Sequence, residues 1–283
     1  MTTKMKRLVK YFYAVCVTVF VIGFTSIPVR AETTDEIEPN DTMEMAQSIM
    51  ANSETASEFI NGTFYGQHII KGYTSVSDED WFVVYLRAGD NYLTCNCSTF
   101  LFEIIASDGA FVQSGTYLSG GGDMEAFRLN ISRDDYYYVK ITGVASTPRE
   151  YLFLIGGPTY LIASDEIKCS PRTIKMTSRG RTQEGIFDGR SVSFPKDAVV
   201  SSVKMNGVRS YDVKAIKLSN DLDWHTLSLN SFTWDKKGIV GLNMRAASKW
   251  TAEFTYNKNT TFTPSLDIEY AYPVYSTPVD PWH

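Results

Sequence analysis

From Phe59 onward the first half of the chain carries apolar residues in short runs, and turn-forming residues such as Ala88-Gly89-Asp90 and Asp108-Gly109 separate them. Runs of this length, rich in Val, Ile, Tyr and Phe, predict β-strands. We see no long stretch of helical period between them. Seven or more short strands joined in this way predict an antiparallel β-sandwich or jelly roll. The predicted strands are 59–65, 80–86, 91–97, 100–106, 125–131, 136–142 and 150–155.

The second half repeats the strand spacing and predicts a second β-sandwich of unknown type over residues 158–272. Gly156-Gly157-Pro158 ends a predicted strand, so we place the boundary of the first domain, 32–157, there and expect an exposed linker. Residues 273–283 are rich in proline, which a central strand does not accept, and predict an extended tail or edge segment. The predicted strands are 160–167, 172–177, 192–194, 199–206, 211–218, 224–230, 250–256 and 266–272.

The N-terminal residues 1–31 have the pattern of a secretory signal peptide. Four basic residues precede an apolar run that ends at Val29-Arg30-Ala31, which predicts cleavage after Ala31 and a secreted or cell-surface protein. The run is nearly long enough to span a bilayer, so an uncleaved membrane anchor stays open as the alternative. After the signal, residues 42–49 predict a short helix, with Asp41 and Glu44 at the spacing of a capping box.

Charge is distributed unevenly along the mature chain. Residues 32–157 contain 19 acidic and 6 basic residues, net −13, whereas residues 158–283 contain 13 acidic and 16 basic residues, net +3. The reversal coincides with the proposed domain boundary. A surface of net charge −13 repels phosphate backbones and attracts cations, which excludes nucleic acid as a partner of this half.

Carboxylates gather at two places in the acidic half. Residues 36–41 hold four oxygen-bearing side chains around Pro39, and a second acidic group lies just before the strand 80–86. Carboxylates this close together repel one another unless a cation lies between them, and Ca²⁺ accepts six to eight hard oxygen ligands. The alternatives are a capping role for Asp41, a solvated linker and a polar turn. The residues at these two places are Glu36, Glu38, Asn40 and Asp41 in the first and Asp78, Glu79 and Asp80 in the second.

Residues 36–156 resemble the bacterial pre-peptidase C-terminal domain, to which the clostridial collagen-binding domains are related. The likeness is carried by Glu36-Ile-Glu-Pro-Asn-Asp-Thr42 with Ala46, by Gly62 leading to Asp78-Glu-Asp-Trp-Phe-Val84, by Leu86-Arg-Ala-Gly-Asp-Asn-Tyr-Leu93, and by Asp135-Tyr-Tyr-Tyr-Val-Lys-Ile141. The resemblance implies a jelly roll that binds an extracellular polymer or protein without catalysis. It also implies that the acidic segment folds over the start of a strand and that both ligate Ca²⁺. By this resemblance the candidate calcium ligands are Glu36, Glu38, Asn40, Asp41, Asp78 and Asp80.

Three consecutive tyrosines offer a candidate binding face. Side chains alternate along a strand, so Tyr137 faces opposite to Tyr136 and Tyr138. In the collagen-binding relatives exposed tyrosines contact the ligand, which by resemblance makes Tyr136 and Tyr138 candidate ligand-binding residues. The alternative is that they only pack.

Motifs for catalysis are absent from the sequence. It contains no Gly-x-Ser-x-Gly elbow, no His-Glu-x-x-His and no phosphate-binding glycine loop. Cys95 and Cys97 share one predicted strand face and are interpreted as small buried residues, since histidines are too few for a zinc site. With Cys169 they make an odd number, and their pairing stays open.

We therefore expect a non-enzyme, a secreted or cell-surface binding or adhesion protein that recognises an extracellular protein or polysaccharide. One alternative is a glycosidase or other hydrolase on the second sandwich, because Asp221 and Asp223 precede Trp224 and, with Trp234 and Trp250, have the chemistry of a sugar platform. In the competing interpretation these tryptophans fill the core. A structural envelope protein is the other alternative.

Overall fold

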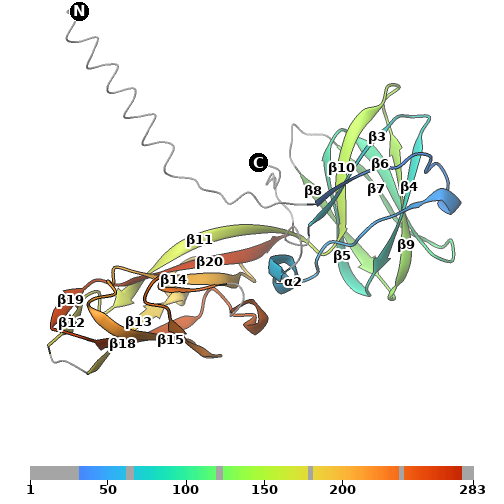
Figure 1. The fold of residues 1–283 in the computed structure, drawn as a ribbon. Helices are drawn as coiled ribbons and strands as arrows, with labels where there is room; N and C mark the ends of the chain where they lie inside the picture. The colour runs from blue at the N-terminus through green and yellow to red at the C-terminus, as the bar shows by residue number, and fades with distance from the viewer. Residues whose placement is uncertain (1–31, 62–66, 119–123, 178–180, 236–238, 276–283) are drawn as a thin grey trace, which may run out of the picture. The chain divides into compact units, whose positions relative to one another are not determined.

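The computed structural model describes residues 32–61, 67–118, 124–177, 181–235 and 239–275. These residues are nearly all β, as the sequence predicts (Figure 1). The predicted signal peptide lies outside the described residues. Among the described residues, no helix has the length and apolar character that crossing a membrane requires.

The first half of the chain is a sandwich of two five-stranded sheets. Inward side chains of both sheets meet in one core, where Phe82 of one sheet packs edge-on against Phe153 of the other with ring centroids 5.2 Å apart. One sheet has the order β1 (Glu32–Asp35), β3 (His68–Thr74), β10 (Arg149–Gly156), β5 (Gly89–Cys97) and β8 (Glu125–Ile131). The other has the order β2 (Gln47–Ser48), β4 (Glu79–Leu86), β9 (Asp135–Gly143), β6 (Phe100–Ala106) and β7 (Phe111–Tyr117).

The second half places most of its strands in one eight-stranded sheet. Its two edge strands come together, because His225 of β16 stacks on Trp234 of β17 with ring centroids 4.9 Å apart and an interplanar angle of 14°. The sheet therefore curls around its own core, which includes the fully buried Trp250 and Phe254. Its order is β16 (Trp224–Leu227), β15 (Val213–Ser219), β18 (Lys249–Tyr256), β13 (Thr182–Asp188), β11 (Thr159–Ser170), β20 (Ser265–Val274), β14 (Val199–Asn206) and β17 (Thr233–Trp234).

Short elements complete the described structure. β12 (Ile174–Met176) pairs with β19 (Thr260–Phe262) in a separate two-stranded sheet. Four short helices are present among the described residues: α2 (Ala56–Asn61) and the 3₁₀ turns η1 (Met43–Met45), η3 (Gly189–Ser191) and η4 (Val240–Leu242).

Three local predictions are wrong. The helix predicted over 42–49 is only the single turn η1 followed by strand β2, and no side chain caps η1. Of the strand predicted over 59–65, residues 59–61 belong to helix α2, where the buried Phe59 stacks on Tyr160, and residues 62–65 lie outside the described residues. The strand predicted over 192–194 is irregular chain after η3.

The junction between the halves is buried rather than exposed. The strands up to Gly156 and those from Thr159 onward belong to different sheets, which matches the position of the predicted boundary. However, the buried Asn52 donates from its amide to the carbonyl oxygens of Gly157 and Pro158 at 3.2 and 2.8 Å. The expected exposed linker is therefore wrong, and independent folding of each half stays a prediction.

The predicted tail begins two residues too early. Strand β20 runs to Val274 and includes Pro273, which is paired with Tyr160 of β11. On the other side of β20 the pairing with β14 ends at Ala271. Pro273 is accepted because it lies where the strand has a neighbour on one side only.

Candidate metal centre

The acidic segment after β1 contacts both sheets of the sandwich, β3 through Glu36 and β4 through Asn40. Parallel pairing of β1 with β3 brings Asp35 opposite Lys71, and the Glu36 amide donates to the Lys71 carbonyl at 2.8 Å. This register places the Glu36 side chain against Gly72. A Cβ at Gly72 would lie 1.8 Å from Glu36 Oε2, so only glycine leaves room for this carboxylate. Glu36 Oε2 accepts hydrogen bonds from the Tyr73 amide at 2.8 Å and the Tyr151 hydroxyl at 3.0 Å.

Asp80 enters the site from the second sheet. It is the second residue of β4, and alternation along that strand turns Asp80 inward with Phe82 and Val84. Asp80 is 0% exposed, and neither carboxylate oxygen has a hydrogen-bond partner of normal geometry, although the Tyr151 hydroxyl interacts with this carboxylate. A buried carboxylate in this state is costly unless it is protonated or a cation compensates it.

Asn40 shows the same lack of partners. Its residue is 0% exposed, and both polar atoms of its side-chain amide are unpartnered. Its backbone is fixed on both sides, since its amide donates to Glu38 Oε2 at 3.0 Å and its carbonyl accepts from the Trp81 amide at 2.9 Å. Asn40 is therefore held between Glu38 and the strand that carries Asp80.

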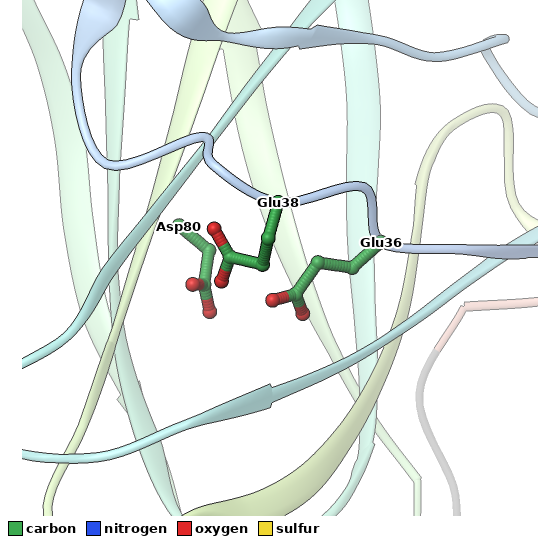
Figure 2. Close-up of side chains that lie close together, drawn as sticks. All are labelled: Glu36, Glu38 and Asp80. Atoms are coloured by element: carbon green, nitrogen blue, oxygen red, sulfur yellow. The ribbon is translucent and has the colours of Figure 1, made fainter.

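The carboxylates form two groups that share Glu38. Ligand oxygens of Glu36, Glu38 and Asp80 lie within 4.8 Å of one another, and Figure 2 shows these three carboxylates drawn together beneath the acidic segment. Oxygens of Glu38, Asp41 and Asp78 form the second group, also within 4.8 Å. The structure thus brings together the acidic residues that the sequence predicts, from two stretches about forty residues apart.

Burial and mutual repulsion weaken the acidity of this cluster. Desolvation, followed by the hydrogen bond and charge of Glu38, raises the pKa of Glu36 to about 7. Desolvation and the nearby Glu36 charge raise the pKa of Asp80 to about 8. The pKa of Asp78 is raised by desolvation and by the charges of Glu38 and Asp41. Lys71, the neighbouring base, does not relieve this repulsion, because its ammonium pairs with Glu150 at 2.8 Å.

These raised pKa values predict that the metal-free protein loses stability as the pH rises. The unfolded chain ionises Glu36 and Asp80 near the ordinary pKa values of these side chains, 4.5 and 3.8, whereas the folded chain does so only near 7 and 8. Between these limits the unfolded state binds fewer protons, so each step up in pH favours unfolding. In chelator we expect a lower melting temperature at about pH 8.5 than at about pH 5.5. Asp80→Asn should flatten this dependence, and a melting temperature that rises over the window would contradict the assignment.

The donor set fits a hard divalent cation. Every candidate ligand offers oxygen, and Ca²⁺ takes six to eight oxygens from carboxylates, amide carbonyls and water. A cation beside Asp80 would satisfy its two carboxylate oxygens. It would also offset the repulsion among the carboxylates that share Glu38.

Two residues that the sequence did not single out complete the site. Tyr151 is fully buried, and its hydroxyl lies against the cluster, where burial and the charges of Asp80 and Glu36 raise the pKa of this phenol. Gly72 makes the space for Glu36. Both lie inside strands, away from the acidic stretches 36–41 and 78–80 in the sequence. The pairing of β3 with β10, which sets Tyr151 opposite Gly72, is what identifies them.

The other candidate residues are distributed over the surface and the two cores. Tyr136 is exposed, Tyr138 is half-buried and Tyr137 is fully buried, which confirms the predicted alternation. Cys95 is buried, but Cys97 is only half-buried because it ends β5 with a φ of 76°, so the interpretation of Cys97 as a buried residue is wrong. Cys95, Cys97 and Cys169 form no disulfide.

The predicted sugar platform of the second half does not form from its predicted tryptophans. Trp234 and Trp250 are buried and pack edge-on in the core, with ring centroids 6.5 Å apart. The Asp223 carboxylate takes part in a turn, where it accepts a hydrogen bond from the Trp224 amide at 2.8 Å. Trp224 is exposed.

Comparison with known proteins supports the fold. No family model and no curated protein matches the chain. A crystal structure of a candidate secreted protein from Eubacterium rectale is similar, with a TM-score of 0.53 and 11% identity over 87% of this chain and 88% of that one. At that identity the likeness shows a shared all-β fold.

Two further structures are less similar. The pre-peptidase C-terminal domain of Bacillus anthracis collagenase covers 39% of this chain and 93% of its own, with 12% identity and a TM-score of 0.28. The CBM22-1–CBM22-2 tandem domain of Paenibacillus barcinonensis Xyn10C covers 72% of this chain and 85% of its own, with 9% identity and a TM-score of 0.22. The structural resemblance to the pre-peptidase C-terminal domain is therefore weak and partial.

Proposed function

We propose that this chain is a secreted, non-catalytic binding protein that holds an extracellular protein or polymer on one sheet of its first half, and that Ca²⁺ fastens the acidic segment beside that sheet. The observation that carries the proposal is a continuous apolar surface on the outer side of strands β4, β9, β6 and β7. We call it the aromatic face. Its members are Trp81, Val83, Tyr85, Ile105, Phe111, Tyr136 and Tyr138.

Strand register makes this surface continuous. Residues directly opposite one another on neighbouring strands share a face of the sheet. Val83, Tyr138, Ile105 and Phe111 follow one another across four strands in a single row. Tyr85 lies opposite Tyr136 beside that row.

Three side chains of the aromatic face, Tyr85, Phe111 and Tyr136, are exposed, and the others are half-buried beside them. The rings of Tyr85 and Tyr136 meet edge-on at 5.4 Å, and those of Trp81 and Tyr138 at 6.5 Å. Phe111 is 64% exposed and Tyr136 is 55% exposed. Contiguous exposed apolar surface of this kind marks binding sites in soluble proteins, and rigid aromatic side chains lose little entropy when they bind.

The metal centre lies at the start of the same sheet. Asp80 points inward and Trp81, its neighbour on β4, points outward to the aromatic face. A cation at Asp80 would therefore hold the acidic segment against the first residues of the strand that carries Trp81 and Tyr85. The net charge of −13 over residues 32–157 favours ligands that carry basic groups.

An array of extracellular matrix proteins and glycans tests the proposal. We expect the chain without residues 1–31 to bind at least one component. Replacing Tyr85 and Tyr136 together by Ser should weaken that binding by about tenfold or more, because two aromatic contacts of roughly 1 kcal/mol each are lost. Val76→Ser, an exposed apolar loop residue outside the aromatic face, is the control and should bind as wild type does. Undiminished binding by the double variant would show that the aromatic face is not the site.

A further inference from the structure

We propose that the outer side of the curled sheet in the second half carries a separate binding site for a neutral polysaccharide, centred on Trp224. The inference rests on the proposed extracellular binding role but uses a different surface from the aromatic face. We call it the Trp224 platform. It comprises Trp224, Ser219, Thr251, Thr226, Lys217 and Glu253.

The register of three strands assembles this platform. Trp224 of β16 lies opposite Ser219 of β15, which in turn lies opposite Thr251 of β18. A second row, two residues further along each strand, consists of Thr226, Lys217 and Glu253. Leu218, Ala252 and Leu227, which alternate with these residues, are buried, so both rows belong to the outer face.

The Trp224 ring is exposed yet held in place. Its residue is 58% exposed, and the Lys217 ammonium lies 4.8 Å from the ring centroid. The backbone before it is a tight turn, in which the Asn220 side chain accepts from the amides of Leu222 and Asp223 at 2.8 and 3.1 Å. The Trp224 amide itself donates to Asp223. The backbone of Trp224 is held by the turn, and Lys217 lies against one face of its ring. A ring restrained in this way is preorganised for a ligand.

The chemistry around the ring indicates a sugar. A pyranose has one face of C–H bonds, which packs on an aromatic ring, and a rim of hydroxyls, which need donors and acceptors. The platform supplies the hydroxyls of Thr251 and Thr226 and the charged ends of Lys217 and Glu253. The Ser219 hydroxyl donates to the Thr251 carbonyl at 3.3 Å and offers a ligand only its acceptor lone pairs. An apolar protein partner would instead leave these polar groups without water or hydrogen bonds.

Charge on the platform excludes the acidic ligands that a lone lysine would attract. Glu253 lies opposite Lys217 on one side and opposite Glu184 of β13 on the other. Asp221 and Asp223 flank the exposed Leu222 at the turn, which also disfavours an anionic membrane surface. The ligand class that remains is a neutral polysaccharide.

Affinity electrophoresis tests this inference. The chain without residues 1–31 is run in native gels that contain soluble xylan, mixed-linkage β-glucan, hydroxyethylcellulose or galactomannan. We expect retardation in at least one gel and a loss of affinity of about tenfold or more for Trp224→Ala, because the stacked apolar area is lost. Trp224→Phe should retain part of the affinity.

The matched control is Tyr211→Ala. Tyr211 is 53% exposed, belongs to the same half and also has cations over its ring, Arg209 at 4.7 Å and Lys258 at 4.2 Å. The Tyr211→Ala variant should be retarded in the gels as strongly as the wild-type protein. Retardation should persist in chelator and in the Tyr85→Ser/Tyr136→Ser variant, which separates this site from the aromatic face. No retardation of wild type in any gel, retardation of Trp224→Ala equal to wild type, or Trp224-dependent sedimentation with phosphatidylserine vesicles in place of retardation would overturn the inference.

Discussion

Calcium should raise the melting temperature of this protein by about 5 to 10 °C when it is present at roughly a hundred times its dissociation constant. A ligand that binds only the folded state adds RT ln(1 + [L]/Kd), which is about 2.7 kcal/mol at that excess. For a chain of this size each kcal/mol corresponds to about 2 to 4 °C. The source of the effect is the carboxylate of the buried Asp80, together with the carboxylates of Glu36 and Glu38. Mg²⁺ should add less, because it requires a tighter octahedral shell.

Two variants and one control test whether the calcium shift in melting temperature comes from the acidic cluster. Asp80→Asn and Glu38→Gln each remove a charge from the cluster and should abolish most of the calcium shift. Glu125→Gln removes the same charge from an exposed position on β8 and should keep it. Equal melting curves of wild type in millimolar Ca²⁺ and in chelator would mean that the acidic segment is a solvated linker.

Trp250→Ala should destabilise the second half by about 3 to 5 kcal/mol. Trp250 is fully buried inside the curled sheet and packs edge-on against Trp234, so its removal leaves a cavity that the surrounding strands fill only in part. Denaturant unfolding followed by circular dichroism measures the change.

Trp224→Ala is the matched control for Trp250→Ala in the unfolding experiment. The same chemical change at an exposed position should alter the free energy of unfolding by no more than about 0.5 kcal/mol. A loss under about 1 kcal/mol for Trp250→Ala would contradict a core closed around that ring.

Strand positions could be predicted where the apolar runs are long. The stretches over 100–106, 125–131 and 199–206 match β6, β8 and β14. Strands β3 and β13 were missed because each is interrupted by polar or small residues, among them Lys71, Gly72 and Gly185. These strands acquire their conformation by pairing with a neighbour on each side. For example, β3 lies between β1 and β10 and pairs with both. Local sequence does not encode such neighbours.

The carboxylates of the candidate metal centre could be predicted because crowded negative charge is visible in the sequence itself. Their juxtaposition is a tertiary effect: the parallel pairing of β1 with β3 determines where Glu36 lies, and alternation on β4 turns Asp80 inward. The contributions of Tyr151 and Gly72 depend on the pairing of β3 with β10, which sets these two residues opposite each other. The curled sheet of the second half likewise follows from long-range contacts such as the stack of His225 on Trp234.

Isothermal titration of Ca²⁺ into chelator-treated protein tests the calcium centre most directly. The structure predicts a saturable heat for wild type that is lost in Asp80→Asn. It also predicts loss in Gly72→Ala, whose methyl group would occupy the place of the Glu36 carboxylate. The Glu125→Gln control should titrate as wild type does. The absence of any saturable heat in wild type, or an unchanged titration of both Asp80→Asn and Gly72→Ala, would contradict a calcium centre built from these residues.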